Sequence, residues 1–277
     1  MPPVVTLDEI ADYPDAVVAD VRWYLDGRDG HDAYTAGHLP GAVFVSLDRD
    51  LAAHALPAVE GRHPLPTPLA FALAMGALGI GDGTTVIAYD DTGGMTAGRL
   101  VVMLRMLGHD AALLDGGMAA FDGELMPGDG AVPEHLDFTP KDWPADRTAT
   151  TDETIAIASR PDGVVLDARA TPRFTGEVTA IDPRPGHIPG ATSAPWSDVL
   201  DATTGRFKSP DELREHFARL GAVDASDVVG SCGSGVSTCI NIIAMEHAGL
   251  RPARLYAASF SGYAADANRD VELGPGR

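Results

Sequence analysis

The stretch Val228-Val-Gly-Ser-Cys-Gly-Ser-Gly-Val-Ser-Thr238 places a thiol inside a glycine-rich turn. A short apolar run enters the turn and an apolar helical pattern leaves it, so we expect Cys232 at the tip of a strand, just before a helix. Backbone N–H groups at a helix N-terminus lack partners within the helix, and the helix dipole adds partial positive charge. A thiol in this setting ionises more readily than a free cysteine, and the thiolate is the reactive form. We therefore predict that Cys232 is a nucleophile rather than a packed core thiol.

The chain carries the features around this turn twice, in the same order. Three pairs of segments match: Val17-Val-Ala-Asp-Val-Arg22 with Val164-Val-Leu-Asp-Ala-Arg169, His38-Leu-Pro-Gly-Ala42 with His187-Ile-Pro-Gly-Ala191, and Thr85-Val-Ile-Ala-Tyr-Asp90 with Asp227-Val-Val-Gly-Ser-Cys232. One match could arise by chance, but three in one order indicate a duplicated domain. We expect both histidines to be structural, satisfying backbone carbonyls at a turn.

Capping signals place helices after the strands of each half. Ser209-Pro-Asp-Glu212 is a capping box with proline at the first helical position, and Thr67-Pro68 starts the counterpart in the first half. The predicted helices cover about 67–79, 96–107, 209–221 and 237–248. Short apolar strands that alternate with helices indicate a parallel sheet covered on both faces. The sequence therefore predicts an α/β fold with two tandem domains, each a central, mostly parallel sheet flanked by helices.

The predicted domains are 1–122 and 145–277, joined by a linker at 123–144 that is rich in Gly, Pro and Asp. Ligands of parallel α/β sheets bind outside the carboxyl ends of the strands, where Cys232 is expected. The first domain has Asp90 at the matching position, and a carboxylate offers no nucleophilic sulfur. The second domain is therefore expected to hold the chemistry.

Composition narrows the classes of partner. The chain has 277 residues, of which 45% are hydrophobic, and a formal net charge of -20, which argues against binding nucleic acid or anionic membranes. It has two cysteines, and we interpret Cys239 as a core residue of the helix after the turn. No disulfide framework, membrane span or secretory signal is visible, so a cytoplasmic monomer is expected. Its nine histidines show no metal-ligand spacing, and we expect neither a metal nor an organic cofactor.

The sequence resembles the two-domain rhodanese-type sulfurtransferases over nearly its whole length. The resemblance rests on the Asp-x-Arg strand ends, the paired His-x-Pro-Gly-Ala segments, the loop from Cys232 to Thr238, and Leu113-Leu-Asp-Gly-Gly117 followed by Phe121. Within the family, a Cys-Gly-Ser-Gly-Val loop resembles the 3-mercaptopyruvate branch. The thiosulfate branch typically carries charged residues directly after the cysteine, where this chain has Gly233 and Ser234.

The resemblance implies a reaction in two steps. The Cys232 thiolate takes sulfur from a small anionic donor, mercaptopyruvate or thiosulfate, and becomes a persulfide. A thiol, a cyanide ion or a protein cysteine then removes that sulfur. Backbone N–H groups of the loop can stabilise the anionic sulfur, and the residues expected to supply them are Gly233, Gly235, Val236, Ser237 and Thr238.

The resemblance also implies donor-binding and proton-relay residues. Arg169 matches the substrate arginine of the family, although a structural ion pair with Asp167 is the alternative, and Arg184 is a second candidate.

The leaving pyruvate enolate needs a proton, and the family is thought to use a Ser-His-Asp relay. Ser234, His63 and Asp48 fit that relay. In the alternative interpretation, His63 is an ordinary loop residue and Asp48 is a turn residue.

Three other functions stay open. A cysteine phosphatase needs an arginine six residues after the cysteine, where this chain has Thr238. A non-catalytic interaction module is favoured by the segment Tyr256–Tyr263, which departs from the tryptophan-containing ending of the family, and opposed by the intact cysteine loop. Thiosulfate is the alternative donor to mercaptopyruvate, which the uncharged Gly233-Ser234 pair and His63 favour.

Overall fold

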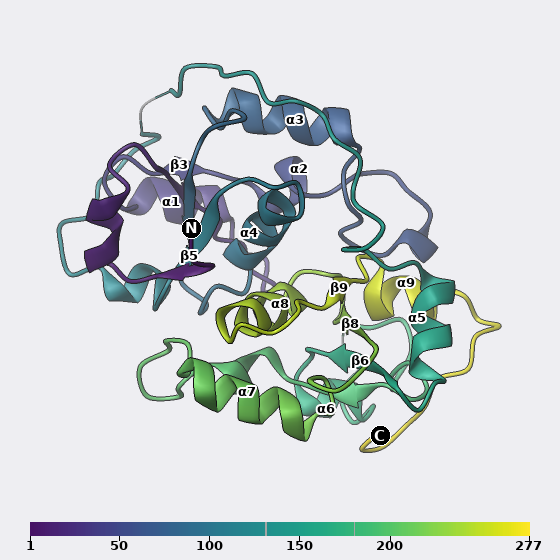
Figure 1. The fold of residues 1–277 in the computed structure, drawn as a ribbon. Coiled ribbons are helices and arrows are strands. Elements are labelled where there is room, and N and C mark those ends of the chain that lie inside the picture. Colours follow the sequence, from purple (N-terminus) through teal and green to yellow (C-terminus); the bar gives the residue numbers. More distant parts are fainter. Residues whose placement is uncertain (131, 180) are drawn as a thin grey trace. The chain divides into compact units, whose positions relative to one another are not determined.

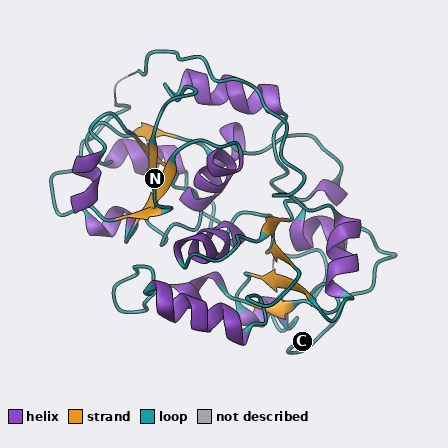
Figure 2. Cartoon of the chain, viewed as in Figure 1, coloured by secondary structure: helices purple, strands orange, loops and turns teal. Residues whose placement is uncertain are grey.

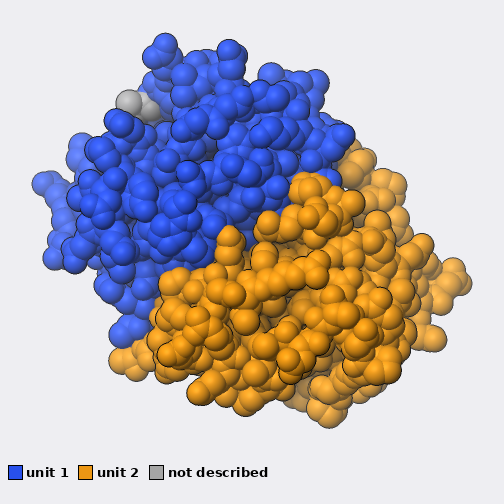
Figure 3. All heavy atoms as spheres, in the orientation of Figure 1, with its two compact units in different colours: residues 1–53, 65–143, 204–206 blue, residues 54–64, 144–203, 207–277 orange. Residues whose placement is uncertain are grey.

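Two parallel sheets organise the chain in the computed structural model (Figure 1), which describes residues 1–130, 132–179 and 181–277. The chain divides into two units (Figure 3). Unit 1 comprises residues 1–53, 65–143 and 204–206, and unit 2 comprises residues 54–64, 144–203 and 207–277. None of the helices in the described ranges combines the length and apolar character that a membrane span requires.

Within the described residues, unit 1 holds a five-stranded sheet in the order β1-β5-β4-β2-β3, with every pair parallel. Its strands are β1 (Val4–Val5), β2 (Val17–Asp20), β3 (Val43–Phe44), β4 (Val86–Tyr89) and β5 (Ala111–Leu114). Its helices are η1 (Asp8–Asp12), α1 (Gly30–Ala36), α2 (Leu47–Asp50), α3 (Pro68–Ala77), α4 (Ala97–Met106) and η3 (Gly117–Ala120). Every residue of β4 and β5 is buried, as expected for inner strands covered on both faces.

The described part of unit 2 holds a four-stranded parallel sheet in the order β7-β6-β8-β9. Its strands are β6 (Gly163–Asp167), β7 (Thr192–Ser193), β8 (Asp227–Ser231) and β9 (Arg254–Leu255). Its helices are η2 (Ala58–Glu60), α5 (Thr151–Ala158), α6 (Thr171–Phe174), η4 (Trp196–Val199), α7 (Pro210–Arg219), α8 (Thr238–His247) and α9 (Ser259–Ala265). Figure 2 shows strands enclosed by helices in each unit.

The predicted α/β fold is confirmed, and the helix signals act as expected. Ser209 and Glu212 form the reciprocal capping box at the start of α7, and the Thr67 hydroxyl caps α3. The duplication is visible in the element order, because β2, β4 and α4 of unit 1 reappear as β6, β8 and α8 of unit 2. The segment 123–143, which the sequence suggests is part of a linker, belongs to unit 1.

The paired histidines support their own domains. The Nδ1 atom of His38 lies 3.0 Å from the Tyr34 carbonyl oxygen, and that of His187 lies 2.9 Å from the Phe174 carbonyl oxygen. Each imidazole also stacks on the ring of the same partner residue. Both histidines thus have the structural role that the sequence predicts.

Candidate active site

Cys232 lies where β8 ends and the turn into α8 begins, with 1% of its surface exposed. The backbone N–H of Gly235 donates to its Sγ atom over 3.1 Å. Gly235 has a φ of 73°, and a Cβ atom there would lie 2.5 Å from the Ala257 carbonyl oxygen. Glycine is therefore required at the position whose N–H faces the sulfur. Farther along the turn, Val236 and Thr238 are buried and Ser237 is half-buried.

The chain just before and within α9 holds this turn from the other side. The N–H of Cys232 donates to the Ser259 hydroxyl over 3.0 Å, and that hydroxyl donates to the Tyr256 carbonyl over 2.8 Å. The N–H groups of Phe260 and Ser261 donate to the carbonyls of Cys232 and Gly233. Ser259 is not glycine but has a φ of 51°, a conformation that a side chain rarely adopts. The segment Tyr256–Tyr263 thus shapes the cysteine turn without the tryptophans of the family pattern.

The matching turn of unit 1 directs several backbone N–H groups at one acidic side chain. The Asp90 carboxylate is fully buried at the position equivalent to Cys232. It accepts backbone N–H bonds of 2.8 to 2.9 Å from Thr92, Gly94, Thr96 and Ala97, and a hydroxyl bond from Thr96. Unit 1 fills its own anion site with a carboxylate, whereas unit 2 places a thiol at the same point.

The structure brings Ser234 and His63 together within unit 2. The His63 Nδ1 atom lies 3.0 Å from the Ser234 hydroxyl, and both side chains are buried. His63 reaches this place because residues 54–64 belong to unit 2, although they lie in the first half of the sequence. The N–H of the preceding residue, Arg62, donates to the Ser261 hydroxyl over 3.1 Å. Asp48 belongs to α2 of unit 1 and accepts a hydrogen bond from the Trp23 indole; its role beside His63 stays a prediction.

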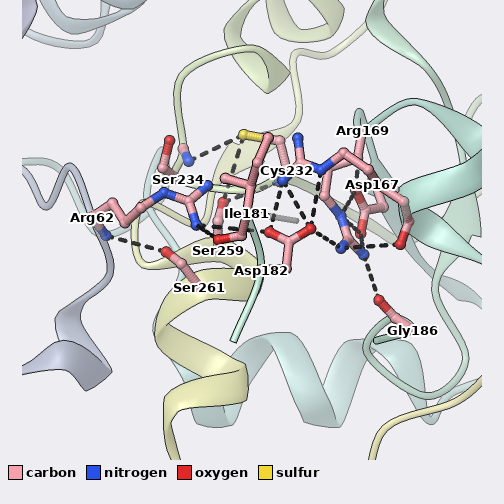
Figure 4. A network of polar contacts seen from close by, with 12 residues as sticks. Arg62, Asp167, Arg169, Ile181, Asp182, Gly186, Cys232, Ser234, Ser259 and Ser261 are labelled. Carbon is pink, nitrogen blue, oxygen red and sulfur yellow. Dashed lines mark hydrogen bonds and ion pairs between the residues drawn. The ribbon is translucent and has the colours of Figure 1, made fainter. Parts of the chain in front are cut away.

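The structure places Arg169 in an internal ion pair. Its guanidinium, 1% exposed, donates to both carboxylate oxygens of Asp167, and Nη2 donates to the Gly186 carbonyl. Burial works to lower its pKa, but Asp167 and Asp182 raise the pKa above its usual value. Figure 4 shows this network.

Unit 1 repeats the same arrangement. Arg22 binds Asp20 through two guanidinium nitrogens and the Gly37 carbonyl through Nη2. Because unit 1 has no thiol at the matching turn, the shared arrangement has a structural explanation that needs no donor.

Arg184 does not face the cysteine turn through its charged groups. Its Nε, Nη1 and Nη2 atoms donate to the carbonyls of Ala264, Arg269 and Asp266, over 2.8 to 3.1 Å. The guanidinium therefore binds the chain around the end of α9. The structure thus shows a structural role for Arg184, and its role in donor binding stays a prediction.

Two other arginines, which the sequence reasoning missed, lie against the cysteine turn. A Cβ atom on Gly233 would come within 2.7 Å of Arg62 Nη2 and 2.8 Å of Arg173 Nη2. The Arg62 and Arg173 side chains stay 33% and 20% exposed, unlike that of Arg169. Burial is the main reason that the pKa of Arg62 is lowered. A signal was available, because Arg62 directly precedes His63 and Arg173 follows Arg169 by about one helical turn.

Known proteins resemble this chain over both halves. The model of the rhodanese-like domain matches residues 5–124. The probable 3-mercaptopyruvate sulfurtransferase of Pseudomonas aeruginosa is 40% identical over 276 residues, which cover 94% of this chain and 93% of that protein. The chain belongs to the rhodanese-type sulfurtransferases.

Two further relatives and two solved structures agree with this assignment. A putative thiosulfate sulfurtransferase SseB of Mycobacterium tuberculosis is 36% identical over 93% of this chain and 90% of its own length. The 3-mercaptopyruvate sulfurtransferase of Escherichia coli is 33% identical over 96% and 95%.

The structure of the Leishmania major 3-mercaptopyruvate sulfurtransferase matches with a TM-score of 0.84 and 31% identity, over 95% of this chain and 74% of that one. Escherichia coli SseA matches with a TM-score of 0.81 and 29% identity, over 94% and 99%.

This sulfurtransferase thus joins a thiol, a hydroxyl–imidazole pair and two guanidinium groups around one turn of unit 2. The curated relatives carry enzyme names, which favours catalysis over a purely structural interaction module. Within the described residues, no three His, Cys, Asp or Glu side chains lie close enough to hold a metal ion.

Proposed function

We propose that this sulfurtransferase moves a sulfur atom from 3-mercaptopyruvate to a thiol or cyanide acceptor through a persulfide on Cys232. The observation that carries the proposal is the Cys232 sulfur, which accepts the Gly235 N–H while two arginines lie over the adjacent Gly233. The filled anion site around Asp90 supports the view that such a turn stabilises a charged outer sulfur. Relatives over most of the chain bear the name 3-mercaptopyruvate sulfurtransferase.

The donor carboxylate is assigned to Arg173 and Arg62. Their guanidinium ends are the cationic groups beside Gly233, and both keep part of their surface exposed. A planar guanidinium binds a carboxylate through two parallel hydrogen bonds. Arg169 is less suited to this role, because its side chain is fully buried and its donors bind Asp167, Asp182 and a carbonyl. Arg173 also binds Asp182, through Nε and Nη2, but 20% of its side chain stays exposed.

In the first step, a sulfur atom moves from the donor carbon to the Cys232 sulfur. The Cys232 thiolate attacks the donor sulfur, an S–S bond forms, and the C–S bond breaks with its electron pair on the pyruvate carbon. The resulting enolate takes up one proton to give pyruvate. The donor thiol loses one proton as the persulfide ionises, so the proton count balances. In the second step, an acceptor thiolate or cyanide attacks the outer sulfur and the Cys232 thiolate is regenerated.

The Ser234 hydroxyl and His63 are proposed to carry that proton to the enolate. Their 3.0 Å contact lets the imidazole pass a proton through the hydroxyl, a role that fits a side chain one residue from Gly233. The contribution of Asp48 to this relay, by orienting His63, is part of the same proposal.

Ser234→Ala is expected to slow the reaction with mercaptopyruvate far more than that with thiosulfate. Sulfite leaves thiosulfate without needing a proton, whereas the pyruvate enolate needs one, so we expect kcat to fall about 100-fold for mercaptopyruvate alone. Steady-state rates with cyanide as acceptor measure both. An equal loss with the two donors would contradict the relay, and Ser261→Ala, which removes a nearby hydroxyl that binds Arg62 N–H, serves as the control.

Arg173→Gln is expected to raise KM for mercaptopyruvate about tenfold or more, with a smaller change in kcat. The reason is the loss of a charged hydrogen bond to the donor carboxylate, which is present before and during the reaction. Initial rates over a range of donor concentrations measure it. An unchanged KM would remove Arg173 from the donor site.

Thiosulfate stays the second candidate donor, because SseB of Mycobacterium tuberculosis bears that name. Mass spectrometry of the protein after treatment with each donor tests the proposal directly. We expect a gain of one sulfur atom on Cys232 and a higher kcat/KM with mercaptopyruvate. A higher kcat/KM with thiosulfate would reverse the choice of donor, and no gain with either would overturn the persulfide.

Compartment and assembly are also part of the proposal. Cys232 and Cys239 are both free thiols, which fits a reducing compartment such as the cytoplasm. The groups assigned here to sulfur transfer come from a single chain, which supports action as a monomer.

A further inference from the structure

Asp182 is a carboxylate that the mechanism does not use, and it lies among the arginines of the site. It accepts hydrogen bonds from Arg173 Nε and Nη2 at 2.7 to 3.0 Å and from Arg169 Nη1 at 3.2 Å. Arg62 Nη1 lies 3.7 Å from the Asp182 carboxylate, and only 2% of the Asp182 side chain is exposed. Its pKa is lowered, because the arginines outweigh the effect of burial, so it is charged at neutral pH.

The charges of this group can be counted. The arginine cluster consists of the guanidinium groups of Arg62, Arg169 and Arg173, which carry three positive charges. Asp167 and Asp182 contribute two negative charges, so these five side chains together keep one net positive charge, to which the Cys232 thiolate adds one negative charge for either donor. Without Asp182, two would remain. The count matters because charges this close, and partly shielded from water, interact strongly.

The two candidate donors differ by the same single charge. Mercaptopyruvate presents one carboxylate, whereas thiosulfate carries two negative charges. An added positive charge attracts a dianion more strongly than a monoanion, so loss of the Asp182 charge would shift the preference towards thiosulfate. Discrimination between ligands is a difference of affinities, so a carboxylate that weakens binding of the dianion contributes to specificity.

Unit 1 supplies an internal comparison. Its Arg22–Asp20 pair repeats the Arg169–Asp167 pair, including the bond to a glycine carbonyl. Among the described residues, the hydrogen bonds of the Arg22 guanidinium go to Asp20 and Gly37, with no second carboxylate. The additional acid is thus found in the unit that carries the thiol, so the shared fold does not explain it.

We propose that Asp182 is a specificity-determining residue, which lowers the charge of the arginine cluster so that the site favours a monoanionic 2-oxo acid donor over a dianion. This inference rests on the proposed function, because it concerns the donor that loads Cys232. Asp182 acts through Arg62 and Arg173, and it does not touch the reacting atoms.

The test compares kcat/KM for thiosulfate with kcat/KM for mercaptopyruvate in the full chain, with cyanide as acceptor. In Asp182→Asn the amide keeps the shape and an oxygen acceptor but loses the charge. We expect the thiosulfate-to-mercaptopyruvate ratio to rise about tenfold or more, equivalent to about 1.4 kcal/mol. The control is Asp162→Asn, which removes the same charge from an exposed side chain at the opposite end of β6 and should leave the ratio within about twofold.

A second variant keeps the proposal falsifiable if Asp182→Asn fails to fold. Arg62→Gln removes one positive charge from a partly exposed side chain, so we expect the ratio to fall. An unchanged ratio in Asp182→Asn, or in Arg62→Gln if the first variant is unfolded, overturns the inference. Failure of the proposed function looks different, because then the wild-type protein gains no sulfur on Cys232 from either donor.

Discussion

Cys232→Ser is expected to abolish sulfur transfer, with a loss of at least about 10³-fold in kcat for every donor. A serine hydroxyl stays protonated at neutral pH and cannot form a persulfide, so the covalent intermediate is lost rather than slowed. The variant should fold, because the turn is also held by bonds that do not involve the sulfur, from the N–H groups of Phe260 and Ser261 and to the Ser259 hydroxyl. Thiocyanate formation and the mass of the donor-treated protein measure the two consequences.

Cys239→Ala is the matched control for this prediction. Cys239 is a fully buried thiol whose Sγ atom lies 3.5 Å from the Gly235 carbonyl, on the first turn of α8. Its removal leaves the Cys232 thiol in place, so the mass gain of one sulfur should persist. If sulfur loading survived in Cys232→Ser but disappeared in Cys239→Ala, the persulfide would form on Cys239, and the proposal would be wrong.

Arg169→Met is expected to lower the free energy of unfolding by about 3–5 kcal/mol. The change leaves the buried carboxylate of Asp167 without its bidentate partner and removes one of the arginines that bind Asp182. It also removes the guanidinium that lies 4.0 Å from the centre of the Phe260 ring. Urea unfolding followed by circular dichroism measures the loss.

The equivalent variant in unit 1, Arg22→Met, is the control for the structural explanation. Its ion pair has the same geometry and lies in the unit without the thiol, so a similar loss of stability is expected. If Arg169→Met instead kept wild-type stability and raised KM for the donor, Arg169 would be the donor arginine that the family resemblance implies.

Local patterns along the chain were enough to predict the fold. The segments around Asp90 and Cys232 each combine an apolar strand, a polar turn and a helix, and such patterns depend on neighbouring residues. Capping at Thr67 and Ser209 could be predicted for the same reason, because a cap bonds to residues within one helical turn. The prediction that Cys232 is the nucleophile rests on its place in one of these turns.

The choice among the arginines could not be predicted from local patterns. The sequence offered the Arg169–Asp167 ion pair only as an alternative to donor binding. It gave no role to Arg173, which binds Asp182 in the structure. The contacts of Arg184 with the carbonyls near the end of α9 join residues about 80 positions apart in the chain, so no local pattern indicates them. Hydrogen-bond partners of a long side chain depend on tertiary packing, which a motif does not record.

The sequence by itself determined that this protein is a duplicated α/β chain with a thiol in one of two matching turns, because strand and helix periods, caps and glycine turns act over short distances. Only the tertiary structure decided which groups surround that thiol. It brought residues 54–64 into unit 2, placed Arg62 and Arg173 beside Gly233, and seated Asp182 between them. The physical reason is that charge and hydrogen bonding depend on distance in space, which the order of residues along the chain leaves open.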